Sequence, residues 1–145
     1  MARHDFSFFY DLRVRWSEVD MQAIVFNGNY LNYFDVAFTE YWRELALPDV
    51  IAQAESGLEL FARKAIIEYH APARFDDVLD IGVRCAELGR SSMRFVLEIY
   101  KSDELLVSGE MMYVHADSRL RKSEPVPNNW RNVLIRYETE CPVKT

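Results

Sequence analysis

Residues Trp16 to Trp42 read WSEVDMQAIVFNGNYLNYFDVAFTEYW and hold the longest helical pattern of the chain. Apolar side chains follow the i, i+4, i+7 spacing of one helix face, at Tyr30, Phe34, Ala37, Phe38, Tyr41 and Leu45. Four more apolar residues lie off this stripe, namely Leu31, Tyr33, Val36 and Trp42. The pattern therefore predicts a helix that is buried nearly all round.

Asp20 lies a few residues before the expected start of this helix, which the turn Asn27-Gly28-Asn29 marks. Asparagine is a favourable helix-capping residue, and glycine lets another molecule approach the backbone closely. The amides that begin a helix lack intrahelical acceptors and attract oxyanions and polarised carbonyls. A carboxylate beside them suggests chemistry on a carbonyl, although an aspartate that only forms a turn is the commoner case.

The spacing of Asp20, Ala23, Val25-Phe26 and Tyr30 before a long aromatic helix resembles the signature of the 4-hydroxybenzoyl-CoA thioesterase family, whose members have the hotdog fold. The resemblance covers most of the chain and is strongest over residues 14–47. The chain departs from the family at Ala23, where glycine is usual, and at Asn27, where tyrosine or histidine is frequent. Neither change removes the carboxylate or the amides.

The resemblance implies an acyl-CoA thioesterase that releases free acid and coenzyme A from a small or medium acyl thioester, without a metal or redox cofactor. It implies that Asp20 acts as nucleophile or general base and that the amide of Asn27 polarises the carbonyl. Substrate-binding residues are then expected at Val25, Phe26, Gly28, Asn29, Tyr30, Arg90, Ser91 and Ser92. The resemblance places a basic run that binds the phosphates of coenzyme A at the last three positions, and this chain keeps only Arg90 of that run, followed by Ser91 and Ser92. The family's active site lies between subunits, so a homodimer or homotetramer is expected.

The remainder of the chain reads mainly as strands. Period-two alternation covers residues 6–16, 61–70, 79–85, 93–99 and 105–116, with a loop at 72–77. A short helix is expected over 49–56 and an amphipathic one over 130–137. Short connections favour antiparallel neighbours, and only one long apolar helix is available to cover a sheet. We therefore predict an α+β hotdog fold, with a five-stranded antiparallel sheet wrapped around one long central helix, in a single domain (1–145).

Composition excludes several classes of protein. A net charge of −6 argues against nucleic acid as a partner, and no apolar run approaches the ~20 residues of a membrane span. The two cysteines, Cys85 and Cys141, suit a reducing compartment, so the chain is expected in the cytoplasm. Cys85 falls on the apolar side of a strand pattern and is expected in the core. No histidine or cysteine spacing typical of a metal site is present.

Other residues compete for the predicted roles. Glu40 on the helix is an alternative carboxylate, but an ion pair with Arg43 is its simpler role. Glu18 is interpreted as a neighbour of Asp20 rather than a partner. A second basic cluster follows the last long strand, at Arg119, Arg121 and Lys122. Aromatic residues Phe26, Tyr30, Tyr33 and Phe34 could line an acyl pocket, although core packing is preferred for Phe34 and Phe38.

Two other functions remain open at this point. A non-catalytic acyl-CoA-binding or scaffold protein would use Asp20 only as a loop acid. A hydratase or dehydratase of the same fold would, by resemblance, carry a histidine five residues after the aspartate, where this chain has Val25.

Overall fold

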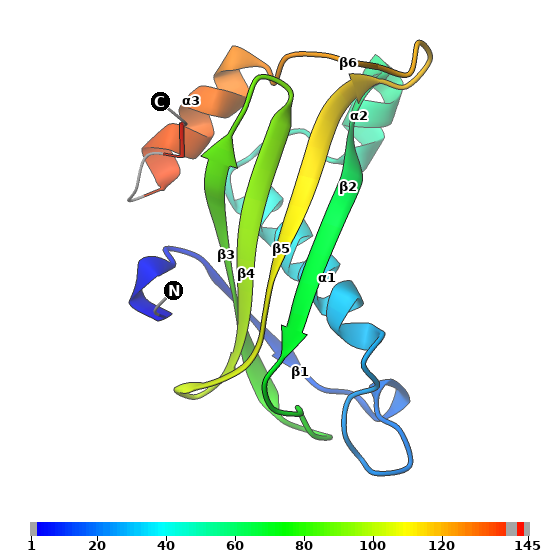
Figure 1. The fold of residues 1–145 in the computed structure, drawn as a ribbon, viewed down its shortest axis with the longest axis vertical. Coiled ribbons are helices and arrows are strands. Elements are labelled where there is room, and N and C mark those ends of the chain that lie inside the picture. The colour runs from blue at the N-terminus through cyan, green and yellow to red at the C-terminus, as the bar shows by residue number, and fades with distance from the viewer. Residues whose placement is uncertain (1–2, 139–141, 144–145) are drawn as a thin grey trace.

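One antiparallel sheet forms the body of the protein (Figure 1). The computed structural model describes residues 3–138 and 142–143. Its five main strands lie in the order β1-β3-β4-β5-β2, and a short sixth strand pairs with β5. Their bounds are β1 Phe9–Arg13, β2 Leu58–Tyr69, β3 Val78–Leu88, β4 Ser92–Lys101, β5 Glu104–Asp117 and β6 Lys122–Ser123. The predicted strand count is confirmed for the main sheet, and β6 is an addition.

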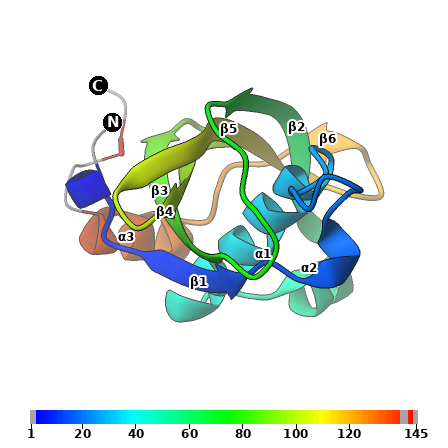
Figure 2. The same ribbon diagram turned by 90° about the horizontal axis from the view of Figure 1, so that it is seen from below.

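The sheet curls around the long helix α1 (Asn29–Glu44), as Figure 2 shows from below. Phe38 stacks on Tyr113 of β5 with ring centroids 4.6 Å apart, and it meets Phe95 of β4 edge-on at 4.9 Å. A Cβ on Gly109 of β5 would lie 2.6 Å from the ring of Phe34, so glycine allows the helix to approach the sheet. Phe34 and Phe38 are core residues, and the predicted arrangement of one sheet around one helix is confirmed.

The helix is not buried all round, and that prediction is wrong. Leu31 is 42% exposed and Val36 is 37% exposed, because the sheet covers only the side of α1 that carries Phe34 and Phe38. Tyr33 and Trp42, which lie off the predicted stripe, are buried.

The first strand is shorter than the alternation suggested. Residues Arg3–Asp5 and Trp16–Glu18 form single 3-10 turns on either side of β1, and Trp16 is 69% exposed. The expected asparagine cap is also absent, since Gly28 is the N-cap of α1 and makes no side-chain hydrogen bond.

The two smaller helices agree with their predictions. Helix α2 (Val50–Ser56) is capped by Asp49, whose carboxylate accepts the amide of Ala52, and it ends at Gly57 in the left-handed conformation. Helix α3 (Asn128–Tyr137) buries Trp130, which meets Trp42 of α1 edge-on at 5.4 Å. No helix in the described part of the chain is both long and apolar enough to cross a membrane.

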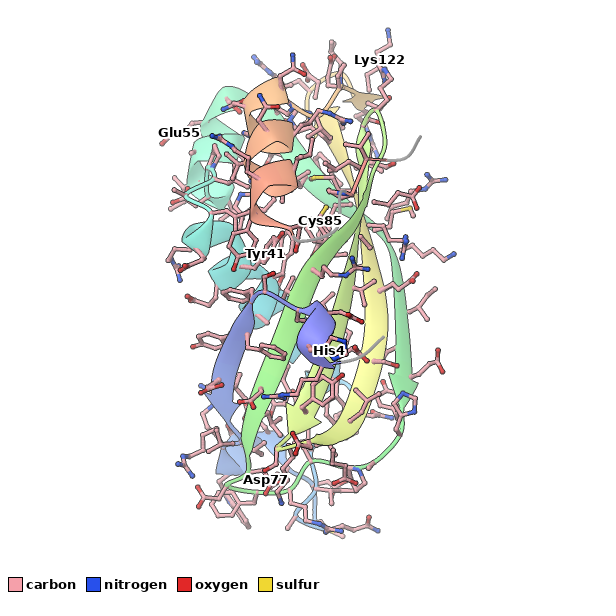
Figure 3. The ribbon with its side chains drawn as sticks, turned by 90° about the vertical axis from the view of Figure 1, so that its left-hand side faces the viewer. His4, Tyr41, Glu55, Asp77, Cys85 and Lys122 are labelled. Carbon is pink, nitrogen blue, oxygen red and sulfur yellow. The ribbon has the colours of Figure 1, made fainter. Side chains whose placement is uncertain are left out.

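Cys85 of β3 lies in the core, near Tyr41 of α1 (Figure 3), as predicted. Burial raises the pKa of its thiol to about 12, so it is a packing residue rather than a nucleophile. Cys141 lies outside the described residues.

Strand β2 forms one edge of the sheet and is open on its outer side. It pairs only with β5 among the described strands. Its apolar side chains Phe61, Ile66 and Tyr69 are exposed. A long edge of this kind presents unpaired backbone groups to another chain.

Candidate active site

Asp20 belongs to a closed loop that immediately precedes α1. Val19 and Val25 form an antiparallel bridge, and the amide of Asp20 donates to the carbonyl of Ile24 at 2.9 Å. One residue further down this stem, the amide of Phe26 donates to the carbonyl of Glu18 at 3.0 Å. The loop therefore leaves the body of the protein at Glu18, presents Asp20, and returns directly to the start of the helix.

A second segment, residues 71–77, holds this loop from the side of the sheet. The amide of Val25 donates to the carbonyl of Ala73 at 2.8 Å, and the amide of Phe75 donates to the carbonyl of Ala23 at 3.0 Å. The amide of Ala73 in turn donates to the hydroxyl of Tyr30 in the first turn of α1, at 3.0 Å. Two backbone hydrogen bonds and one to the side-chain hydroxyl of Tyr30 thus tie together the loop, the helix start and the end of the sheet.

The start of α1 carries two amides that are available to a ligand. Those of Asn29 and Tyr30 donate to the carbonyls of Phe26 and Asn27, at 2.9 and 3.3 Å. Those of Asn27 and Gly28 have no acceptor in residues 3–138 or 142–143, and both residues are exposed. Free amides at a helix start are suited to binding an oxyanion.

The carboxylate of Asp20 is exposed and is not neutralised by a neighbour. Its Oδ1 accepts the amide of Gln22 at 2.8 Å, which fixes the side chain locally as an Asx turn. No cationic side chain of the described residues forms an ion pair with it. A ligand can therefore reach the carboxylate of Asp20 without displacing a cationic side chain.

The remaining predicted residues around this loop separate into exposed and buried groups. Phe26 is 57% exposed, whereas Val25 and Tyr30 are buried and make packing contacts within the chain. Asn29 is half-buried, and its side-chain Nδ2 donates to the carbonyl of Glu18 at 2.9 Å. Phe26 is thus the predicted apolar contact residue that a ligand can reach in this chain.

Glu40 forms an ion pair with Arg43 on the surface of α1, which is the simpler of the two roles expected for it. Its position well along α1 separates it from the free amides of Asn27 and Gly28 at the start of that helix.

Glu18 is the residue at this site whose importance the sequence did not reveal. It is only 8% exposed, and its carboxylate accepts hydrogen bonds from Arg15 and from the hydroxyl of Tyr33. A signal was present in the spacing of Arg15 and Glu18, because residues three apart can form an ion pair within one turn.

Within one subunit, the expected phosphate-binding residues lie far from Asp20 in space. Arg90 and Ser91 form the turn between β3 and β4, and Ser92 begins β4. The Asp20 loop pairs with Arg74, just before β3 begins, so the two groups occupy opposite ends of the sheet. Figure 3 shows these ends at Asp77 and Lys122. The ten residues of β4 separate them by roughly 30 Å.

The end that carries Arg90 also gathers the second basic cluster. Arg119 and Arg121 follow β5, and Lys122 begins the short strand β6. Arg121 and Ser118 line a cavity of about 540 Å³ together with side chains of β2 and β5. Glu59 and Asp117 line the same cavity, so cationic and acidic side chains both occur at this end of the sheet.

The described residues contain no group of three or more histidine, cysteine or acidic side chains placed to hold a metal ion. Exposed His70 shares a hydrogen bond of 2.8 Å with Ser108, and His115 is buried against Trp130.

Residues 14–134 match the thioesterase-like superfamily, and the chain belongs to that family. The acyl-CoA thioester hydrolase YbgC of Escherichia coli O6:H1 is 27% identical over 123 residues, which cover 84% of this chain and 91% of that protein. A solved gentisyl-coenzyme A thioesterase, BH1999, is 25% identical with a TM-score of 0.77, covering 86% of this chain and 99% of its own.

A third protein shares the fold at lower identity. The 1,4-dihydroxy-2-naphthoyl-CoA thioesterase Slr0204 from Synechocystis superposes with a TM-score of 0.83 at 22% identity, covering 88% of this chain and 94% of that one. The fold of the present chain is therefore the hotdog fold.

Proposed function

We propose that this protein hydrolyses the thioester of a small or medium acyl-CoA, releasing the free acid and coenzyme A. One observation carries the proposal: an exposed, unneutralised carboxylate and two acceptor-free amides are held by the same closed loop at the start of α1. Membership of the thioesterase-like superfamily and the names of two relatives that act on CoA thioesters support it.

In the proposed reaction the thioester carbonyl oxygen faces the amides of Asn27 and Gly28. Negative charge develops on this oxygen as the carbon is attacked, and removal of one well-placed donor typically raises the barrier by about 2.7–4 kcal/mol. Phe26, exposed beside these amides, offers an apolar contact for the acyl group.

Asp20 supplies the attack by one of two routes. It adds to the carbonyl carbon and expels the coenzyme A thiolate, and water then hydrolyses the resulting anhydride. Alternatively it takes a proton from a water molecule that adds to the carbon, and collapse of the tetrahedral intermediate expels the thiolate. Both routes need Asp20 to be ionised.

The proposed site is completed by a second copy of the chain. Arg90, Ser91 and Ser92 lie at the far end of the sheet from Asp20, so one chain cannot present both groups to one substrate. Two chains that pair antiparallel through the open edge of β2 would place the far end of one beside the Asp20 loop of the other. The cations of that end would then meet the phosphates of coenzyme A.

Release of free thiol from a panel of acyl-CoA esters tests the function. We expect hydrolysis by the native protein and a loss of at least a hundredfold in kcat for Asp20→Asn. Asp103→Asn is the matched control, because Asp103 is an exposed aspartate in the β4–β5 turn at the same end of the sheet. Unchanged hydrolysis by Asp20→Asn would reject the assigned role.

One observation favours a second candidate, a non-catalytic acyl-CoA-binding protein. The Asx turn of Asp20 with Gln22 is a sufficient structural reason for an aspartate at this position. Saturable binding of coenzyme A, with no thiol release from any ester of the panel, would establish this candidate in place of the enzyme.

A further inference from the structure

We infer that Glu18 is a positioning residue, which sets the geometry of Asp20 relative to the free amides of α1 through its contact with Tyr33. The inference rests on the proposed function, since it assigns how that site is held in its working geometry. Glu18 does not touch the expected substrate position, because its carboxylate points into the protein toward α1.

The carboxylate of Glu18 joins the segment just after β1 to the buried side of α1. Its Oε1 accepts the backbone amide of Arg15 at 2.8 Å and the hydroxyl of Tyr33 at 2.9 Å. Its Oε2 accepts the guanidinium of Arg15 at 2.6 Å. Tyr33 is almost fully buried in the first turns of α1, so it is a rigid anchor for this carboxylate.

The carbonyl of Glu18 makes the second connection, to the residues that flank the free amides. It accepts the amide of Phe26 at 3.0 Å and Nδ2 of Asn29 at 2.9 Å. Asn27 and Gly28 lie between these two donors. One residue, Glu18, therefore fixes both the departure of the Asp20 loop and the backbone that carries the two amides.

The negative charge of Glu18 strengthens its hydrogen bond with Tyr33. Burial alone would raise the pKa of Glu18, but the hydrogen bonds from Arg15 and Tyr33 outweigh burial and lower it. Burial, followed by the hydrogen bond to Glu18, raises the pKa of Tyr33, so its hydroxyl keeps the proton that it donates. A hydrogen bond to an ionised acceptor is stronger than one between neutral groups.

The same helix offers a matched control at its other end. There the hydroxyl of Tyr41 donates to Oε2 of buried Glu138 at 2.8 Å, and the backbone amide of Cys85 donates to the same oxygen at 2.7 Å. Tyr33→Phe and Tyr41→Phe thus remove the same kind of hydrogen bond from a carboxylate oxygen that keeps a backbone donor. Only the first of these bonds leads to the Asp20 loop.

The experiment measures kcat and KM for Tyr33→Phe, Glu18→Gln and Tyr41→Phe, with the free energy of unfolding of each. We expect kcat to fall at least tenfold in Tyr33→Phe and Glu18→Gln with KM within twofold of the native value. Tyr41→Phe should keep the native kcat although it loses comparable stability. Equal effects of the two tyrosine substitutions on kcat, or no effect of Tyr33→Phe, would overturn the inference.

Amide hydrogen exchange gives a readout that does not depend on activity. In Tyr33→Phe the amides of Asp20 and Ala23, which close the loop, should exchange at least tenfold faster than in the native protein, and in Tyr41→Phe they should not. Should the native protein hydrolyse no ester, the proposed function fails, and exchange alone decides the positioning role. Unchanged exchange in Tyr33→Phe would reject that role.

Discussion

The hydroxyl of Tyr30 accepts the backbone amide of Ala73 at 3.0 Å, which joins the first turn of α1 to the segment that leads into β3. Both residues are buried, so no water can replace the hydroxyl as the acceptor for this amide. The contact explains why a tyrosine is needed at a position that packs as a core residue.

We predict that Tyr30→Phe lowers the free energy of unfolding by about 1–3 kcal/mol, the usual effect of leaving a buried donor unpaired. Urea denaturation followed by tryptophan fluorescence measures the change. Tyr69→Phe is the control, because Tyr69 is exposed and its hydroxyl contact with the carbonyl of Asn27 is long, at 3.4 Å. Equal stability of native protein and Tyr30→Phe would contradict the assigned hydrogen bond.

Ala23 has a φ of 61°, a left-handed conformation in which a Cβ is unfavourable. We predict that Ala23→Gly stabilises the protein by up to about 1 kcal/mol, because relief of this strain exceeds the added entropy of the unfolded chain. Thermal unfolding is the measurement. Ala54→Gly within α2 should instead destabilise by up to about 1 kcal/mol, since its conformation is helical. Similar losses in the two variants would show that residue 23 is unstrained.

A site shared between chains predicts complementation. Asp20→Asn and Arg90→Glu should each reduce kcat/KM strongly, and a mixture refolded together should regain about a quarter of native activity if dimers form at random. Half of such dimers would be hybrids, each with one site that has both native groups. Mixing without refolding is the control. If the refolded mixture contains hybrid dimers but regains no activity, the shared site is rejected. Asp20 and Arg90 would then act within one chain, or Arg90 would not belong to the site.

The lowered pKa of Glu18 predicts a pH dependence of stability. A carboxyl whose pKa is depressed by folding stabilises the protein above its unfolded pKa, and that stabilisation is lost as pH falls through the folded pKa. The stability difference between native protein and Glu18→Gln should therefore be largest at neutral pH and shrink below pH 4.5. Urea denaturation over this pH range measures it.

Glu138 should behave in the opposite way. Burial raises its pKa, so its contribution is present below the unfolded pKa and is lost as pH rises through the folded pKa. Glu138→Gln should then be least harmful at high pH. Parallel curves for the Glu18 and Glu138 substitutions would contradict the opposite pKa shifts.

Local patterns in the sequence determined most of the elements. The i, i+4 spacing predicted α1, Asp49 and Gly57 bounded α2, and alternation placed β3, β4 and β5 with Cys85 in the core. These features depend on neighbours along the chain, because side-chain periodicity and turn chemistry act over a few residues. The spacing of Asp20 and Asn27 likewise pointed to a loop beside a helix start, and the structure has such a loop.

Tertiary structure alone decided which surfaces are covered and which groups meet. Leu31 and Val36 have the hydrophobicity of core residues, but the curled sheet reaches only the other side of α1. Glu18 reads as a surface acid, yet Tyr33 and Arg15 surround it. Arg90 lies at the far end of the sheet from Asp20 because β3 and β4 run the full length of the sheet between them. Such distances depend on strand pairing between residues remote in the sequence, which a one-dimensional pattern does not record.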